Sequence, residues 1–195
     1  SFERWYLVLK NPLSFSHMIV KSVVNKGDYV IDATIGNGHD TLFLAELVGN
    51  NGKVFGFDIQ KQAIQSTKER LSKEKSVEQV ELIHDGHENI NNYLPQEKKK
   101  VSAVMFNLGY LPKGDKAIVT KAETTKKAIN QALSQIKKGG IVSIMVYYGH
   151  SGTNGEKEAV DELVRDIPQD KFDSLSYKFV NQRNNPPYLY LIQRK

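Results

Sequence analysis

Residues 30–41 read Val30-Ile31-Asp32-Ala33-Thr34-Ile35-Gly36-Asn37-Gly38-His39-Asp40-Thr41, an apolar strand pattern that runs into two glycines and then into a helical pattern. Glycine tolerates positive φ and has no side chain, so the backbone at Gly36 and Gly38 can approach a ligand closely. The amides that open the following helix can then point at that ligand. The stretch predicts a strand, turn and helix that together hold a cofactor, and a glycine-rich turn without a ligand is the alternative interpretation.

A second strand pattern, Val54-Phe55-Gly56-Phe57-Asp58, ends in a carboxylate 22 residues after Gly36. Nucleotide-binding α/β folds hold ribose hydroxyls with an acidic residue at this separation. Dinucleotide-binding loops carry a glycine or alanine where this chain has Thr41, which disfavours NAD. Asp32 before Gly-x-Gly, with a distant ribose acid, resembles motif I of the S-adenosylmethionine (SAM) methyltransferases, although their usual pattern has a further glycine where Thr34 stands. The predicted cofactor is therefore SAM.

Composition limits the class of protein. The 195 residues suffice for one well-buried core, so we expect a single domain over residues 1–195. The absence of cysteine excludes disulfides and thiolate metal sites and suits a reducing compartment. No apolar run approaches a membrane span and no secretory leader pattern is present, so we expect a cytoplasmic protein. The net charge of +5 permits nucleic-acid binding without demonstrating it.

Strand and helix patterns alternate along the chain, which predicts a doubly wound α/β fold. The last two strands share a short Asn/Pro-rich connection, which predicts a C-terminal antiparallel hairpin on a seven-stranded, mostly parallel sheet. The predicted strands cover 29–34, 53–58, 79–83, 101–107, 140–147, 172–180 and 188–193, and the predicted helices cover 40–48, 61–73, 122–136 and 156–166.

One more helix is predicted before the first strand. Ser14 is a plausible N-cap, and Gly27 supplies a C-terminal stop. Apolar residues recur between them at helical spacing, at Phe15, Met18, Ile19, Val23 and Val24. This helix should cover the sheet and approach the cofactor from outside. The segment before it, with Trp5, Tyr6, Leu7 and Leu9, suits an edge extension, a homodimer contact or an added tail.

Ligands of open α/β sheets bind beyond the carboxyl ends of the strands. His84-Asp85-Gly86-His87 follows the third predicted strand, where Asp85 or the neighbouring amides would contact the adenine of SAM. Two histidines three residues apart also suit a metal, but no third ligand clusters with them. Alternatively, the histidines cap a short helix over 87–92.

The fourth strand leads into Asn107-Leu108-Gly109-Tyr110-Leu111-Pro112-Lys113-Gly114-Asp115-Lys116, which resembles the Asn/Asp-Pro-Pro-Tyr motif of amino-methyltransferases. An amine that attacks a methyl sulfonium needs its lone pair free and aimed, and hydrogen-bond acceptors for its N–H groups achieve this. The Asn107 side chain and the Leu108 carbonyl would be these acceptors, and Tyr110 would offer its face to a planar substrate. A plain turn before a helix is the alternative.

Two further loops suit the substrate side. Tyr147-Tyr148-Gly149-His150-Ser151-Gly152 follows the fifth strand, and His150 could accept a proton near neutral pH or simply be a hydrogen-bonded loop residue. The connection from Asn181 to Tyr188 contains Arg183, which suits contacts with phosphates or bases, and a surface turn is equally compatible with it.

Together, the blocks 32–41, 107–116, 149–152 and 184–187 resemble the MnmM (YtqB-like) family, long described as ribosomal RNA methylases, and the resemblance extends from about Phe15 onward. It implies a Rossmann-like class I SAM-dependent methyltransferase fold. It also implies methyl transfer from SAM to the aminomethyl nitrogen of 5-aminomethyl-2-thiouridine at the tRNA wobble position, with the tRNA anticodon stem-loop as partner. A SAM-dependent enzyme for ribosomal RNA or a small-molecule amine, and a non-catalytic nucleotide-binding module, are the alternative functions.

We expect three groups of site residues and no metal. The catalytic residues are Asn107, Tyr110 and His150. The cofactor-binding residues are Asp32, Thr34, Gly36, Asn37, Gly38, His39, Asp40, Thr41, Asp58, Gln60, Asp85, Gly86, His87 and Asn107. The substrate-binding residues are Leu108, Gly109, Lys113, Lys116, Tyr148, Arg183 and Asn185.

Overall fold

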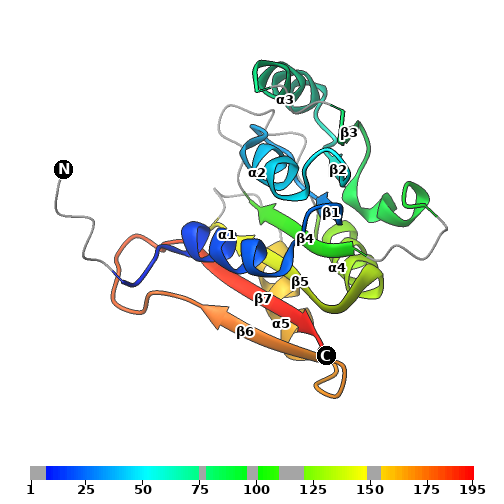
Figure 1. Cartoon of the computed structure of the whole chain (residues 1–195). Coiled ribbons are helices and arrows are strands. Elements are labelled where there is room, and N and C mark those ends of the chain that lie inside the picture. The colour runs from blue at the N-terminus through cyan, green and yellow to red at the C-terminus, as the bar shows by residue number, and fades with distance from the viewer. Residues whose placement is uncertain (1–7, 75–77, 96–100, 110–120, 149–154) are drawn as a thin grey trace.

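The computed structural model describes residues 8–74, 78–95, 101–109, 121–148 and 155–195 (Figure 1). Its seven strands form one sheet with the order β3-β2-β1-β4-β5-β7-β6. The strands are β1 (Tyr29–Asp32), β2 (Lys53–Phe57), β3 (Val80–Ile83), β4 (Val101–Leu108), β5 (Ile136–Val146), β6 (Phe172–Tyr177) and β7 (Tyr188–Arg194). Strands β1 to β5 are parallel, and β7 lies antiparallel between β5 and β6. The predicted seven-stranded α/β fold with its antiparallel hairpin is confirmed.

Two helical layers cover the sheet (Figure 1). Helices α1 (Pro12–Val23) and α2 (His39–Val48) pack on one face, and α3 (Lys61–Lys73) contacts α2. The other face carries η2 (His87–Asn92), α4 (Ala122–Gln135) and α5 (Glu156–Arg165). The pleat of β1 explains the division, because Val30 packs with α1 and α2 while Ile31 packs with α4 and α5. Strands buried on both faces are nearly continuous apolar runs, as in β4.

The topology brings several chain segments to one end of the sheet, which we call the carboxyl end. Strands β1 to β5 all finish there. Tyr188, at the start of β7, pairs with Val146 at the end of β5, so the connection between β6 and β7 lies at the same end. The predicted cofactor loop, Asn107 near the end of β4 and the hairpin connection thus lie at the same end of the sheet, although they are far apart in the sequence.

The start and end of α1 differ from the prediction. Asn11, and not Ser14, is the N-cap, and its Oδ1 accepts a hydrogen bond of 2.8 Å from the Ser14 amide. Pro12 fits here because the first helical position needs no amide donor. The helix ends at Val23, and Gly27, with φ of +87°, forms the turn before β1 instead.

The predicted apolar face of α1 is also partly wrong. Pro12, Ser16 and Val20 are the buried positions of the helix, whereas Met18 is 49% exposed. The hydroxyls of Ser16 and Ser143 lie 2.6 Å apart, so a hydrogen bond to β5 offsets the cost of burying the polar Ser16 side chain. The apolar pattern could not identify this buried polar position.

Strand β5 begins four residues before its predicted start at 140. Val101 pairs with Ile136 and Ala103 with Ile141, so residues 137–140 form a bulge in β5. Gly139 permits this with φ of +79°. Strand β6 ends at Tyr177, three residues early, and the remaining predicted elements agree within two residues.

Of the predicted N-terminal dimer or edge segment, Trp5, Tyr6 and Leu7 lie outside the described residues, and Leu9 is 71% exposed. No helix within the described ranges is long and apolar enough to cross a bilayer.

Candidate functional site

Asp32 is the last residue of β1, and the glycine loop begins directly after it. It is fully buried, and its carboxylate accepts hydrogen bonds from the Thr41 hydroxyl at 2.6 Å and the Thr34 amide at 3.2 Å. Burial and, to a smaller extent, the charge of Asp40 raise the pKa of Asp32 to about 7, although the two hydrogen bonds oppose the shift. Asp32 therefore ties the start of the loop to the first turn of α2.

The two glycines of the loop have different reasons to be glycine. Gly36 has φ of +55°, and its amide donates a hydrogen bond of 2.9 Å to Oδ2 of Asp58. Gly38 has φ of +78°, and a Cβ there would lie 2.5 Å from the Thr67 hydroxyl of α3. The absence of a side chain at Gly38 thus allows α3 to pack closely, whereas the sequence pattern predicted that a ligand approaches this glycine. Asn37 and His39, on either side of it, are exposed.

Asp58 follows β2 and is held by two loops. Its Oδ2 receives the Gly36 amide, and its Oδ1 receives the Gln60 amide at 2.8 Å. Burial raises its pKa, and the two amide hydrogen bonds oppose the shift. The structure therefore places the predicted ribose acceptor against the glycine loop.

The loop after β3 is rigidly hydrogen-bonded. Asp85 accepts hydrogen bonds from the Gly86 amide, the Asn89 side chain and the Tyr93 hydroxyl at 2.7, 2.9 and 2.8 Å. Burial acts to raise the pKa of Asp85, but these three hydrogen bonds outweigh it and lower the pKa. Asp85 is thus positioned as an anion beside β3.

The two histidines of this loop do not cap η2, whose N-cap is Gly86 without a side-chain bond. His84 Nε2 lies 3.0 Å from the Ile59 carbonyl. His87 is 3% exposed, its Nδ1 lies 3.2 Å from the Ala33 carbonyl, and burial lowers its pKa. His87 is therefore a neutral core residue in this structure. Within the described part of the chain, no group of three or more His, Cys, Asp or Glu could hold a metal ion.

Asn107, near the end of β4, is held at two points. Its backbone amide donates to the Thr34 hydroxyl, and its side-chain Nδ2 donates to Oδ2 of Asp40, both at 2.6 Å. Asp40, in the first turn of α2, is 6% exposed, and its Oδ1 lies 2.7 Å from Nε2 of His17. The predicted residues Thr34, Asp40 and Asn107 thus form one network at the carboxyl end.

His17 is the member of this network that sequence reasoning missed. It lies on α1, and its ring stacks on Phe43 of α2 with centroids 4.1 Å apart. The sequence signal was a histidine beside the apolar positions of a helix that was expected to approach the cofactor from outside.

The substrate side differs from the prediction in one respect. The Leu108 carbonyl accepts the Tyr147 amide at 3.0 Å, so one of its two lone pairs belongs to the pairing of β4 with β5. Gly109 follows with φ of +81°, and the two residues border a narrow cavity with Lys157. Tyr110, Lys113, Lys116 and His150 lie outside the described residues.

Tyr148 belongs to an aromatic cluster that the sequence did not indicate. Nζ of Lys157 lies 5.5 Å from its ring centroid and 5.7 Å from that of Tyr188, and forms an ion pair of 3.0 Å with Asp161. Asp161 also accepts the hydroxyl hydrogens of Tyr188 and Tyr190 at 2.6 and 2.7 Å. Burial and the Asp161 carboxylate raise the pKa of both tyrosines, so these side chains are neutral.

The connection between β6 and β7 places Arg183 and Asn185 on the surface at the carboxyl end. Asn184 and Asn185 have φ of +63° and +47°, the left-handed conformation that asparagine tolerates well. The structure therefore brings this predicted substrate segment to the same end of the sheet as Asn107.

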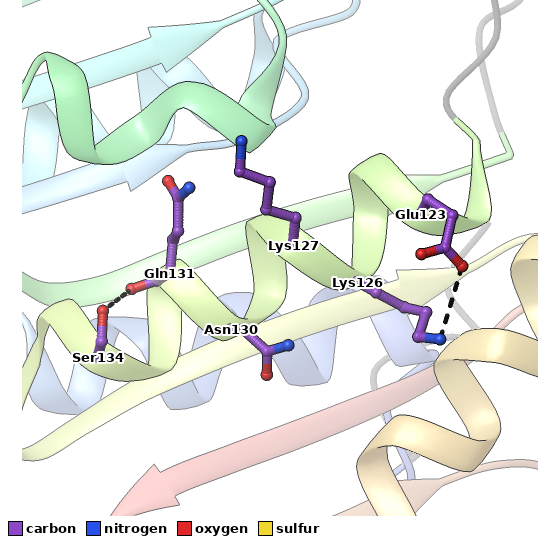
Figure 2. Close-up of a pocket in the computed structure, with 6 residues that line it drawn as sticks. All are labelled: Glu123, Lys126, Lys127, Asn130, Gln131 and Ser134. Atoms are coloured by element: carbon purple, nitrogen blue, oxygen red, sulfur yellow. Dashed lines mark hydrogen bonds and ion pairs between the residues drawn. The ribbon is translucent and has the colours of Figure 1, made fainter.

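A second hollow lies on α4, whose opposite face packs on the sheet (Figure 2). It measures about 480 Å³ and contains none of the predicted site residues. Its lining consists of Glu123, Lys126, Lys127, Asn130, Gln131 and Ser134, with an ion pair of 3.7 Å between Glu123 and Lys126. This open, polar depression lacks the enclosed apolar walls of a typical small-molecule site.

Comparisons with known proteins agree with this geometry. The family model described as "Putative rRNA methylase" matches residues 54–193. The "tRNA (mnm(5)s(2)U34)-methyltransferase, chloroplastic" of Arabidopsis thaliana is 37% identical in an alignment 196 positions long, which covers 95% of this chain and 70% of the relative.

Two solved structures extend the comparison. The structure of a "putative rRNA-methylase" from Clostridium thermocellum is 46% identical with a TM-score of 0.92, over 97% of this chain and 100% of that one. The structure of a "putative methyltransferase" from Streptococcus mutans in complex with SAH is 39% identical with a TM-score of 0.87, over 96% of this chain and 100% of that one. The resemblance predicted from the sequence is confirmed, and the chain belongs to the rRNA methylase family, with the Rossmann-like fold of the class I methyltransferases.

Proposed function

We propose that the chain transfers a methyl group from SAM to the aminomethyl nitrogen of 5-aminomethyl-(2-thio)uridine at the tRNA wobble position, giving 5-methylaminomethyl-(2-thio)uridine. The name of the Arabidopsis relative specifies this position of tRNA, and the Streptococcus mutans structure contains SAH, which is SAM without its methyl group. The observation that carries the proposal is the side-chain amide of Asn107, held beside the glycine loop at the end of β4.

The residues around the glycine loop suit SAM. Asp58 presents a carboxylate, fixed by the Gly36 and Gln60 amides, that can accept hydrogen bonds from both ribose hydroxyls. The first-turn amides of α2 suit the carboxylate of the methionine part, because a helix N-terminus attracts negative charge. SAM supplies a methyl group on a positively charged sulfonium.

Asn107 suits the nucleophile. Its amide oxygen can accept a hydrogen bond from an N–H group of a neutral amine, and this bond aims the lone pair of the nitrogen at the methyl carbon. The N–C bond forms while the C–S bond breaks and its electron pair stays on sulfur. The product nitrogen then releases a proton to water or to an acceptor on the substrate side, for which His150 is the sequence prediction.

The surroundings of Asn107 suit a loop of RNA. Arg183 and Asn185 are exposed at the same end of the sheet, where they can contact phosphates or bases. Tyr148 is half-buried there and offers an aromatic surface to an unstacked anticodon base. We propose the anticodon stem-loop as the binding partner. We also propose that residues 1–195 form one domain and that the enzyme acts in the cytoplasm, whereas the name of the Arabidopsis relative places that protein in the chloroplast.

Methyl incorporation from radiolabelled SAM tests the proposal with matched substrates. One anticodon stem-loop carries 5-aminomethyluridine, a second carries uridine, and further reactions contain ribosomal RNA or the free 5-aminomethyl nucleoside. We expect label only in the first stem-loop, because carbon five of uridine has no nucleophilic nitrogen. Label in ribosomal RNA, or equal label in the free nucleoside, would replace this function with methylation of ribosomal RNA or of a small-molecule amine, and no label in any reaction would favour a non-catalytic nucleotide-binding module.

A further inference from the structure

We propose that His17 and Asp40 are positioning residues that fix which end of the Asn107 amide faces the substrate. The network runs from α1 through α2 to β4, with 2.7 Å between His17 and Asp40 and 2.6 Å between Asp40 and Asn107. The inference rests on the proposed function, because it concerns the Asn107 amide oxygen that would accept a hydrogen bond from the substrate amine.

An ionised carboxylate has only acceptor atoms. Asp40 therefore holds the amide of Asn107 by its NH₂ end, and the amide oxygen is directed away from Asp40. The backbone of Asn107 is held independently by its bond to the Thr34 hydroxyl, so the bond to Asp40 sets the two side-chain torsions and hence the orientation of the amide. The flipped amide would offer N–H groups to the N–H groups of the amine, which would prevent the hydrogen bond.

His17 extends the same logic to α1. Since Asp40 can only accept, Nε2 of His17 carries the hydrogen in their contact. Stacking on Phe43 with an interplanar angle of 10° holds the imidazole ring in that plane. The Asp40 side chain is 7% exposed and the His17 side chain 30%, so Asp40 makes these contacts largely shielded from water. His17 thus acts through Asp40.

The proposal predicts a kinetic signature. As the N–C bond forms, the nitrogen becomes positively charged, and the hydrogen bond from its N–H group to the Asn107 amide oxygen strengthens. An interaction that grows in the transition state affects kcat more than KM or cofactor binding. Misplacing a reacting group by about 1 Å can cost about 100-fold in rate, so we expect kcat to fall about 10- to 100-fold when the network is broken.

Three variants and one control test this signature with the 5-aminomethyluridine stem-loop. His17→Ala and Asp40→Asn should lower kcat as stated, while the dissociation constant of SAM and KM for RNA change about twofold or less. His17→Gln should recover most of the rate, because the glutamine amide can donate to Asp40 in place of Nε2. Ser22→Ala is the matched control on α1, since the exposed Ser22 hydroxyl donates to the Ile19 carbonyl of its own helix, at 2.6 Å.

A second readout needs no substrate. The side-chain ¹⁵N resonance of Asn107, assigned by its loss in Asn107→Ala, should show the shift of an amide bonded to a carboxylate in the parent and in His17→Gln. Asp40→Asn should abolish this shift. If Asp40→Asn keeps the parental kcat and resonance, or if His17→Ala weakens SAM binding as much as it lowers kcat, the positioning role is wrong. If the parent does not methylate the stem-loop, the proposed function fails, while the resonance still decides the amide orientation.

Discussion

Asp58→Ala should weaken SAM binding strongly while the fold survives. In the parent, Oδ2 and Oδ1 of Asp58 are oriented by the Gly36 and Gln60 amides at 2.9 and 2.8 Å, so both oxygens are preset for the two ribose hydroxyls. Hydrogen bonds to a charged group contribute about 1.5–3 kcal/mol each. The loss of two such bonds costs about 3 kcal/mol or more, which raises the dissociation constant of SAM by roughly 150-fold.

Calorimetric titration and thermal unfolding measure this effect. SAM at 100 times the parental dissociation constant should stabilise the parent by about 2.7 kcal/mol and the Asp58→Ala variant by far less. NAD should stabilise neither. Asp173→Ala is the control, because Asp173 is a 74% exposed carboxylate on β6 whose ion pair with Lys195 lies outside the site. Urea unfolding without ligand separates loosening of the glycine loop from loss of ribose contacts. SAM binding by Asp58→Ala as tight as by the parent would refute the assignment of the ribose site.

Three further predictions concern the substrate amine, pH and the loop. Asn107→Ala should reduce kcat by about 100-fold with SAM affinity nearly intact, measured by titration and steady-state kinetics; equal losses would place Asn107 on the cofactor. The pKa of Asp32, raised from 3.8 to about 7, keeps a proton on the folded state that the unfolded state loses. Protonated Asp32 thus contributes fully to the free energy of unfolding below pH 3.8, and this contribution disappears as pH rises through about 7. The free energy of unfolding, measured in urea, should therefore decline less between these pH values in Asp32→Asn than in the parent. Gly38→Ala should destabilise more than Gly155→Ala by about 1–3 kcal/mol, because both have φ near +75° but only a Cβ at 38 meets Thr67; equal losses would leave backbone strain as the whole cost.

Sequence reasoning succeeded where local patterns decide the structure. The run from Val30 to Thr41 fixed both the strand and the glycine loop, and the separation between Gly36 and Asp58 placed two segments that the structure joins by a hydrogen bond. Parallel strands put their carboxyl ends together, so Asn107 could be assigned to the same end before its partners were known.

The missing parts depend on tertiary contacts. Nothing in the sequence pairs His17 with Asp40, because the contact requires the packing of α1 beside α2. Buried Ser16 interrupts the apolar pattern of α1, since its partner hydroxyl lies on β5. The role of Gly38 against α3 is hidden for the same reason, and the local pattern alone could not distinguish a close ligand from a close helix.

Nucleoside mass spectrometry after reaction of the 5-aminomethyluridine stem-loop with SAM tests the central claim most directly. The RNA is digested completely, and the mass and fragmentation of each nucleoside locate the added methyl group. We expect 5-methylaminomethyluridine to replace 5-aminomethyluridine at the wobble position, with every other nucleoside unchanged. A methyl group on ribose or on a ring nitrogen, with the wobble aminomethyl group untouched, would contradict the account.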